Sequence, residues 1–152
     1  MTRINLIDPS LLTDQHLFAE FREIKMVPKS LARSLRTKSI NEIYRTIPAQ
    51  FTLNAGHVKF FFDKGSYLRD RYEQIKSELR RRKVNFDEAS IFDPDGVMLG
   101  DPWNGCYTPS NRDIEIIQAR IKERIMEKPT WYRFRGINLN ENGNIPNQEE
   151  QQ

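Results

Sequence analysis

An amine and a carboxylate near the start of the chain could together do chemistry on a sugar. Thr2 follows Met1; because a small second residue favours removal of the initiator methionine, we expect the α-amine of Thr2 to be exposed. The pKa of an α-amine is about 7.7–8.0, so its neutral fraction at pH 7 is roughly 400-fold larger than that of an ordinary lysine. Such an amine can attack a sugar or carbonyl carbon and form an imine. Many unrelated proteins also begin Met-Thr, so this feature is informative only with a partner.

Glu23 is the candidate partner of that amine. It shares one helical face with His16 and Glu20, at spacings of four and then three residues, beside a predicted apolar stripe. A carboxylate at the edge of a core can have a raised pKa and can transfer protons. The same spacing also suits an amphipathic helix with ordinary ion pairs, and both interpretations remain open. Arg3 and Arg22 are candidates for compensating charge or holding phosphates.

The net charge is only +3, but the sequence contains three basic segments. Residues 22–45 hold seven Lys/Arg against two acids, residues 64–83 eight against three, and residues 112–136 seven against four. Residues 84–111 hold five acids and no base. This distribution suggests a polyanion partner, although ordinary solvated helix faces would give the same distribution of charge.

Aromatic and basic residues alternate near the C-terminus, in the segment from Trp131 to Arg135. This pattern suits a surface that stacks on bases and contacts phosphates. It equally suits a strand that seals the core, and the two can coexist if alternate side chains point in opposite directions. His57 is interpreted as a half-buried structural histidine, and Cys106 as unreactive.

Apolar spacing predicts a first helix from about Thr13-Asp14 to about Lys38. Its buried stripe comprises Leu17, Phe21, Ile24, Leu31 and Leu35. Pro28 lies in this stripe, so we expect a kink or a division there. A basic stripe about 120° around the helix comprises Arg22, Lys25, Lys29, Arg33 and Arg36.

Two further helices are predicted, over about 64–83 and from the capping residues 110–113 to about Lys128. Leu68, Tyr72, Ile75 and Leu79 should face inward on the first of them. Residues 46–63 read as irregular chain through the core, with a short strand possible. Residues 84–109, rich in Gly and Pro, read as a long surface loop. The polar residues 137–152 are predicted to be disordered.

Several classes of protein are disfavoured. The chain contains no stretch that approaches 18 apolar residues, so we expect no membrane span. A single cysteine fits a reducing compartment, and we expect a cytoplasmic monomer. Phosphate-loop, dinucleotide-binding and zinc-protease motifs are missing from the sequence, and we expect no metal or cofactor.

The chain resembles the pyrimidine-dimer DNA glycosylase family, the endonuclease V type of T-even phages. The matching segments are residues 1–6, 14–17, 19–23, 55–58, 60–64, 118–120 and 129–132. They occur in the family's order over residues 1 to about 136. Departures are Met26, where the family carries an arginine that contacts DNA, and Ser90, which replaces a threonine. We expect Lys25 to substitute for that arginine, and the departures bear on DNA affinity and lesion preference.

The resemblance implies an all-α fold: one compact domain over residues 1–136, with three main helices, long loops and an N-terminal segment that threads between helices. It also implies a bifunctional N-glycosylase and AP lyase acting on double-stranded DNA with pyrimidine dimers or abasic sites. Alternatives are a non-catalytic DNA-binding protein on the same scaffold, or a glycosylase for another damaged base.

The resemblance also implies roles for individual residues, by the family positions that they match. The resemblance places Thr2 as the nucleophile that forms an imine with the damaged nucleotide's sugar, and Glu23 as the group that supports proton transfer. His16 and Arg22 match positions near the active centre. Positions that contact DNA are matched by Arg3, Gln15, Arg22, Lys25, Arg120, Arg124, Trp131 and Arg133.

Overall fold

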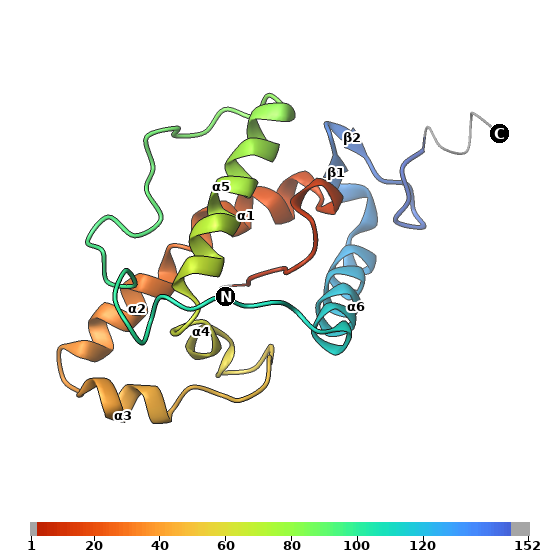
Figure 1. Cartoon of the computed structure of the whole chain (residues 1–152). Helices are drawn as coiled ribbons and strands as arrows, with labels where there is room; N and C mark the ends of the chain where they lie inside the picture. The colour runs from red at the N-terminus through yellow and green to blue at the C-terminus, as the bar shows by residue number, and fades with distance from the viewer. Residues whose placement is uncertain (1–2, 147–152) are drawn as a thin grey trace.

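Helices account for nearly all of the regular secondary structure among the described residues. The computed structural model describes residues 3–146 (Figure 1). Its α-helices are α1 (Asp14–Glu23), α2 (Met26–Leu35), α3 (Ile40–Arg45), α4 (His57–Phe60), α5 (Gly65–Arg81) and α6 (Asn111–Glu127). The 3₁₀ turns η1 (Pro9–Leu11) and η2 (Pro129–Trp131) and the antiparallel pair β1 (Arg133–Phe134) and β2 (Ile137–Asn138) complete it. The predicted all-α class is confirmed.

The first predicted helix is divided into α1 and α2, and the division precedes Pro28. Thr13 caps α1 by accepting a hydrogen bond from the His16 N–H. A proline has no N–H to bond to the carbonyl four residues earlier, and its ring crowds that carbonyl. That carbonyl belongs to Ile24, which instead accepts from the Val27 N–H at 3.2 Å. The proline thus interrupts the helix one turn before its own position.

Two short helices lie in segments for which no helix was predicted. The α3 helix is capped by Ser39 and buries only Ile43, so it is too short to show an apolar stripe. The α4 helix lies within residues 46–63, which were expected to be irregular or to contain a strand; the structure has no strand there. The expected passage through the core is confirmed, because Phe51, Phe60, Phe61 and Phe62 are all buried.

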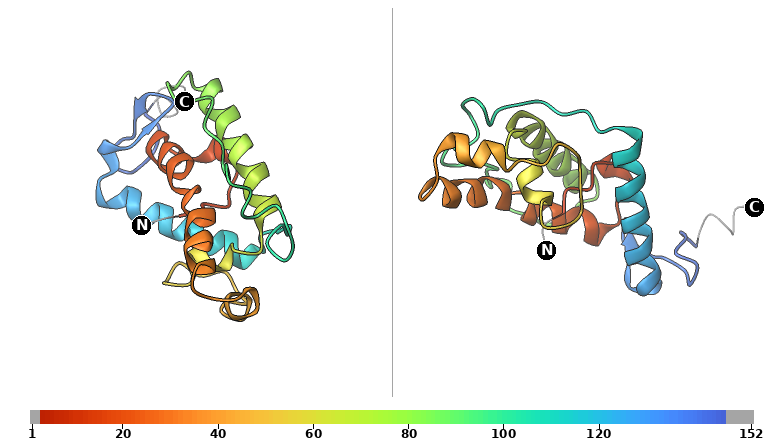
Figure 2. Two further views of the ribbon diagram at one scale, coloured as in Figure 1. Left: turned by 90° about the vertical axis from the view of Figure 1, so that its left-hand side faces the viewer. Right: turned by 90° about the horizontal axis from the view of Figure 1, so that it is seen from below.

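The two long helices α5 and α6 agree with their predictions. The four inward residues expected on α5 are at most 1% exposed. Ser110 and Asp113 form a reciprocal capping box at the start of α6. α6 stands at one end of the molecule (Figure 2). Among the described residues, no helix is long and apolar enough to cross a membrane.

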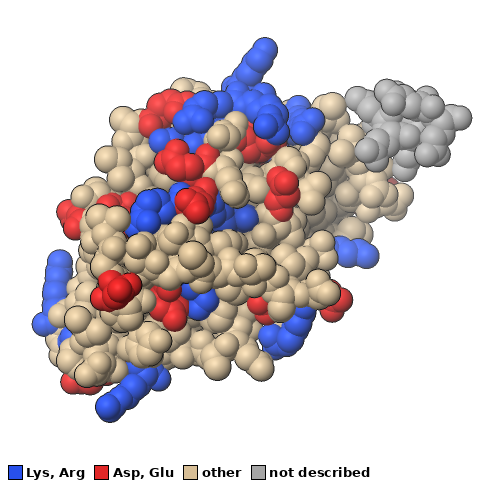
Figure 3. Space-filling view, viewed as in Figure 1, with Lys and Arg blue, Asp and Glu red and all other residues tan. Residues whose placement is uncertain are grey.

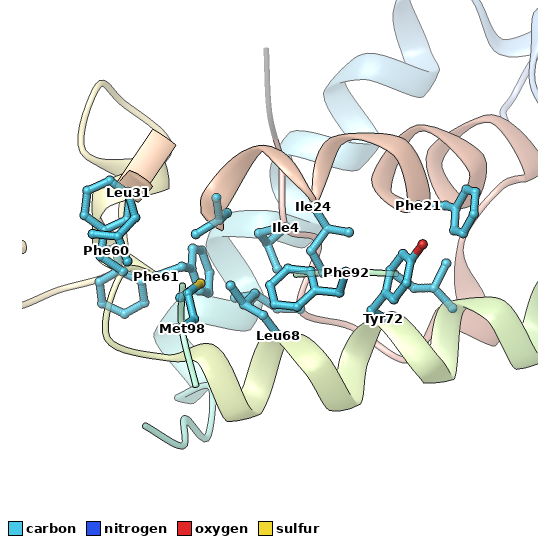
Figure 4. Packing of buried hydrophobic residues seen from close by; sticks show 14 of the residues in the cluster. Ile4, Phe21, Ile24, Leu31, Phe60, Phe61, Leu68, Tyr72, Phe92 and Met98 are labelled. Carbon is cyan, nitrogen blue, oxygen red and sulfur yellow. The ribbon is translucent and has the colours of Figure 1, made fainter. Parts of the chain in front are cut away.

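The core lies mainly between α1, α2 and α5, and receives side chains from two non-helical segments. Ile24 from the α1–α2 junction and Leu68 and Tyr72 from α5 face one another, with Ile4 and Phe92 beside them (Figure 4). Phe21 and Tyr72 stack with ring centroids 5.4 Å apart. The core is therefore closed by the N-terminal segment and by the long loop.

The loop over residues 84–109 contains no helix or strand, as predicted, but it is not only a surface loop. Its side chains Phe92, Met98 and Trp103 are at most 4% exposed. The Gly65 N–H donates to the Trp103 carbonyl at 2.7 Å, and a Cβ at Gly65 would lie 2.8 Å from that oxygen. A glycine at the start of α5 thus lets the loop pack against the helix.

The chain also has described structure beyond residue 136, in the segment predicted to be disordered. Residues 137 and 138 form β2, and Leu139 is 6% exposed. A turn at Gly143, with φ +77°, brings the chain against Ile125 and Met126 of α6. The prediction of disorder is therefore wrong for residues 137–146, because Leu139 and this turn pack on the domain. Residues 147–152 lie outside the described residues.

A buried ion pair attaches the N-terminal segment to α1 and α5. The Arg71 guanidinium on α5 donates to both carboxylate oxygens of Glu20 on α1. The same Glu20 accepts from the Asn5 N–H at 3.0 Å, and Arg71 donates to the Ile7 carbonyl at 2.9 Å. The segment therefore runs between helices, as expected for this fold (Figure 1).

Loss of Arg71 should destabilise the protein far more than loss of an exposed arginine on the same helix. We expect Arg71→Met to lower the free energy of unfolding by about 3–5 kcal/mol, because Glu20 would stay buried without its partner. Arg80→Met removes an arginine whose pair with Glu88 is about half exposed, and should leave the free energy of unfolding nearly unchanged, because exposed ion pairs contribute little to stability. Urea unfolding at neutral pH measures both, and equal losses would contradict this account.

Candidate active site

A pocket of about 270 Å³ opens where the N-terminal segment, α1, α6 and the C-terminal aromatic segment meet. Its lining residues are Arg3, Asn5, His16, Ala19, Glu20, Glu23, Arg120, Ile121, Arg124 and Tyr132. We call it the Glu23 pocket. It brings together residues more than 100 positions apart in the sequence, including five of those singled out above.

Positive charge dominates the Glu23 pocket. Burial and the nearby charges of Arg120 and Arg124 lower the pKa of Arg3, while Glu23 opposes this shift. The other carboxylate, Glu20, is already bound by Arg71. Arg120 and Arg124 pair with Glu123 and Glu127 at 3.2 and 3.5 Å on the α6 surface. Three arginines line the pocket with Glu23 and the already neutralised Glu20, so an anionic ligand bound there would compete with Glu123 and Glu127 for Arg120 and Arg124.

Hydrogen bonds fix the register of the chain that enters the pocket. Arg3 donates from Nη1 to the Leu53 carbonyl at 3.0 Å. The Ile4 N–H donates to Nε2 of His57 at 2.9 Å, and Nδ1 of that imidazole lies 2.8 Å from the Thr52 carbonyl. These partners define a neutral ring with its proton on Nδ1. Thr2, the predicted nucleophile, lies outside the described residues; the residue after it lines the pocket.

His16 forms part of the pocket wall as a neutral ring. Its Nδ1 lies 2.6 Å from Oγ1 of Thr13, and its ring stacks on Tyr132 with centroids 5.0 Å apart and planes within 3°. Burial lowers the pKa of His16 to about 4. At neutral pH it can therefore stack and hydrogen-bond, but it carries no charge.

Two side chains in the first turn of α1 form hydrogen bonds with the main chain of the C-terminal segment. Gln15 donates to the Trp131 carbonyl at 2.8 Å and accepts from the Arg133 N–H at 2.9 Å. Asp14 accepts from the N–H groups of Arg135 and Gly136 at 3.0 and 2.8 Å. These bonds place Tyr132 on His16. The DNA contact predicted for Gln15 stays a prediction. In this structure its side-chain amide binds the main chain of the protein itself.

Four other predicted residues lie outside the lining of the Glu23 pocket. Arg22 is exposed on α1, with its guanidinium 5.9 Å from the Phe18 ring centroid. Lys25 donates to Oγ of Ser90 at 2.9 Å. Trp131 is 57% exposed, and Arg133 is exposed on β1. Arg22, Trp131 and Arg133 are therefore exposed to a ligand larger than the pocket, whereas the amine of Lys25 is engaged by Ser90.

A model of the family described as pyrimidine dimer DNA glycosylase matches residues 1–92. The chain belongs to this family. The match includes the N-terminal segment and α1 with Glu23, which supply one side of the Glu23 pocket, and α5 with Arg71, which pairs with Glu20. The protein is therefore a DNA glycosylase of DNA repair, with DNA as its substrate. The matched range ends before α6 and the C-terminal segment, whose arginines and Tyr132 complete the pocket.

Not every basic segment of the glycosylase is free to bind DNA. Lysines and arginines gather over the end of α5 (Figure 3), but Arg80 pairs with Glu88, and both Arg81 and Arg82 pair with Glu78. The side chain of Arg82 is 1% exposed, binds Asp14 at 2.9 Å and lies over the Phe134 ring, so it joins the start of α1 to β1. Arg80 and Arg81 remain largely exposed, as do Lys29, Arg33 and Arg36 on α2.

Sequence reasoning missed the residues that hold the pocket together. Arg71 and Glu20 were given no structural role, nor was His57 linked to the N-terminal segment. One signal was present: Arg71 falls between Leu68 and Tyr72 in the inward stripe of α5, where a charge requires a buried partner. Which acid supplies that partner cannot be read from spacing along the chain.

Metal ligands do not cluster in the part of the chain that is described. Among residues 3–146 we find no group of three or more His, Cys, Asp or Glu side chains that could hold a metal ion. Cys106 is exposed.

Acid should weaken the fold through its two histidines. Burial lowers the pKa of both His16 and His57 from 6.5 to about 4, so below about pH 6.5 the unfolded chain takes up protons that the folded chain does not. Stability should fall as the pH drops towards about 4, by up to about 1.4 kcal/mol per pH unit for each histidine.

The variant His57→Gln keeps an acceptor for the Ile4 N–H and removes one titrating group. Urea unfolding at a series of pH values should show a shallower fall than in the wild type between about pH 6 and about pH 4.5. A fall of unchanged steepness would mean that His57 does not contribute.

Gln15→Ala should loosen one end of the C-terminal segment selectively. The Arg133 N–H loses its acceptor, so its hydrogen exchange should accelerate about fivefold or more, since a lost hydrogen bond is worth about 1 kcal/mol or more. The N–H groups of Arg135 and Gly136 are held by Asp14 and should keep their protection, which provides an internal control. Uniform acceleration at all three amides would contradict separate attachment.

Proposed function

We propose that this glycosylase removes ultraviolet-induced cyclobutane pyrimidine dimers as a bifunctional N-glycosylase and AP lyase that uses the α-amine of Thr2. The main support is the Glu23 pocket, where a carboxylate and three arginines meet the anchored start of the chain. The family relation supports glycosylase chemistry on DNA. Double-stranded DNA with a dimer or an abasic site is the proposed ligand, bound by a monomer.

In the first step the neutral amine attacks C1′ of the deoxyribose on the 5′ side of the dimer. The N-glycosyl bond breaks, and the base leaves with its bonding electrons and takes up a proton. The amine then loses a proton, the C1′–O4′ bond of the sugar ring opens with a proton added to O4′, and a protonated imine remains between C1′ and Thr2. The amine's near-neutral pKa suits this step without a cofactor. Hydrogen bonds at Ile4 and Asn5 support it by restricting the chain that carries the nucleophile.

Glu23 is proposed to move protons during the lyase step. It is half-buried at the end of α1 and lines the pocket beside Arg3. A carboxylate there can help open the sugar ring and accept a proton from C2′ of the imine. Loss of that proton expels the 3′ phosphate by β-elimination. Water then hydrolyses the imine and restores the amine.

Arginines around the pocket are proposed to hold the phosphates that flank the lesion. Burial and the charges of Arg120 and Arg124 lower the pKa of Arg3, so a bound phosphate would relieve the repulsion among the three arginines. Phosphate contacts position a duplex without reading its sequence. Exposed Trp131, beside Tyr132, offers a face on which a base can stack.

Borohydride should trap the wild-type protein on a duplex that contains one thymine dimer, because reduction of the imine leaves a covalent adduct. An intact mass that confirms removal of Met1 is the prerequisite, since a retained methionine moves the amine by one residue. Undamaged duplex is the matched control. Binding without any adduct would instead indicate a non-catalytic DNA-binding protein, and an adduct only on another lesion would indicate a different damaged base.

Glu23→Gln should reduce strand scission by at least about 100-fold, the usual contribution of a positioned general acid or base. DNA binding should stay largely intact, because the substitution removes a negative charge from a site for an anion. Glu73→Gln, at an exposed position on α5, is the control and should leave scission unchanged. Single-turnover cleavage and filter binding measure the two properties, and undiminished scission would exclude Glu23 from the proposed role.

A further inference from the structure

The start of the described chain presents alternate side chains to the Glu23 pocket and to the core. Arg3 and Asn5 line the pocket, whereas Ile4 and Leu6 belong to the hydrophobic core. Such a two-residue alternation is the property of extended chain, in which successive side chains point to opposite sides. The side chain of Asn5 therefore faces the pocket, on the same side of the segment as Arg3.

Asn5 is held by its main chain, while its carboxamide is unpaired. Its N–H donates to Oε1 of Glu20 at 3.0 Å, and its carbonyl accepts from the Ile7 N–H. Only 4% of the residue is exposed. Within residues 3–146 the carboxamide forms no hydrogen bond. A rigidly held amide with free hydrogen-bonding capacity therefore faces the pocket.

A second polar group at the pocket also lacks a partner. Nε of Arg120 is enclosed and makes no hydrogen bond to any described residue, although Nη1 of the same guanidinium binds Glu123 at 3.2 Å. Buried polar groups in folded proteins are nearly always paired. Two unpaired N–H donors on one pocket therefore indicate a polar ligand that offers an acceptor to each of them.

Chain geometry keeps Asn5 close to the proposed nucleophile. Three Cα–Cα steps of about 3.8 Å separate it from Thr2, so the two Cα atoms can be at most about 11 Å apart. When the amine attacks C1′ of a pyrimidine nucleotide, O2 of the base is linked to that carbon through only N1 and C2. The carboxamide is therefore within reach of the O2 edge of the base that leaves.

We propose that the carboxamide of Asn5 donates a hydrogen bond to O2 of the 5′ pyrimidine of the dimer while the N-glycosyl bond breaks. The inference rests on the proposed function, since it assigns a group to the first chemical step. The electron pair of the C1′–N1 bond passes to N1, and Nδ2 of Asn5 stabilises the charge that develops on O2. The amide gives up no proton; a proton from water then neutralises N1.

A cyclobutane dimer concentrates this charge on O2. Saturation of C5 and C6 removes the conjugation between N1 and the C4 carbonyl, so the charge on N1 is shared only with O2. A fixed donor that is largely shielded from water stabilises such a developing charge better than water does. Since thymine and cytosine both carry O2, the contact recognises a pyrimidine without distinguishing the two.

Two substrates separate loss of the base from the lyase step. One duplex carries a single thymine dimer, and the other a preformed abasic site, from which no base has to leave. Asn5→Ala should slow excision at the dimer by about 100-fold or more, the usual loss with one donor to a developing oxyanion. Scission of the abasic duplex should slow by less than about threefold, because that step expels no base.

Single-turnover kinetics measure both rates, with alkali used to reveal every site from which the base has been excised. The loss should appear in the rate at saturating protein and not in the affinity for the dimer duplex. Asn5→Leu fills a similar space without a donor and should show the same split. Asn41→Ala, at an exposed position on α3, is the matched control and should behave as the wild type on both duplexes.

Scission of the abasic duplex at nearly the wild-type rate also shows that a variant is folded. Equal slowing on both duplexes would overturn the proposal, because Asn5 would then only hold the N-terminal segment. Unchanged excision in Asn5→Ala and Asn5→Leu would overturn it as well. A wild type that is inactive on both duplexes would refute the proposed function and this step with it, whereas an active wild type without the split in the variants would refute only the role of Asn5.

Discussion

The ion pair between Glu20 and Arg71 is the interaction on which the site depends. Glu20 binds Arg71 through both oxygens and also accepts from the Asn5 N–H, while Arg71 reaches the Ile7 carbonyl. Glu20 is 1% exposed and Arg71 3%. Burial alone lowers the pKa of Arg71, but the Glu20 charge and hydrogen bonds raise it, so the arginine remains charged. One buried pair therefore holds the N-terminal segment at two points.

A second set of contacts holds the C-terminal segment, which forms another wall of the Glu23 pocket. Asp14 and Gln15 bind the main chain of the C-terminal segment, and this support places Tyr132 against His16. Because α1 carries Glu20, Glu23 and both of these contacts, one ten-residue helix connects the two ends of the chain. Both histidines at this boundary are neutral at pH 7, which leaves the arginines to set the charge of the pocket and suits a DNA substrate.

Much of the fold was predictable because the apolar residues that a helix buries recur in the sequence with the period of the helix. The apolar stripes located α1, α2, α5 and α6, and capping residues located the starts of α1 and α6. The short helices α3 and α4 left too few apolar positions to be recognised. The tail beyond Gly136 was misjudged because polar composition does not reveal that Leu139 and Gly143 pack against the domain. Glu23 and the arginines of α6 were recognised, whereas the residues that position them were not.

The sequence by itself determined the all-α class, the family and the candidate chemical groups, because these depend on residue type, spacing and local order. Only the tertiary structure decided that Arg3, Glu23, Arg120 and Tyr132 line one pocket and that the side chain of Gln15 binds main chain. Contacts such as Gln15 with Trp131 join residues more than a hundred positions apart. Their energies depend on burial and geometry in the folded chain, which spacing along the sequence does not record.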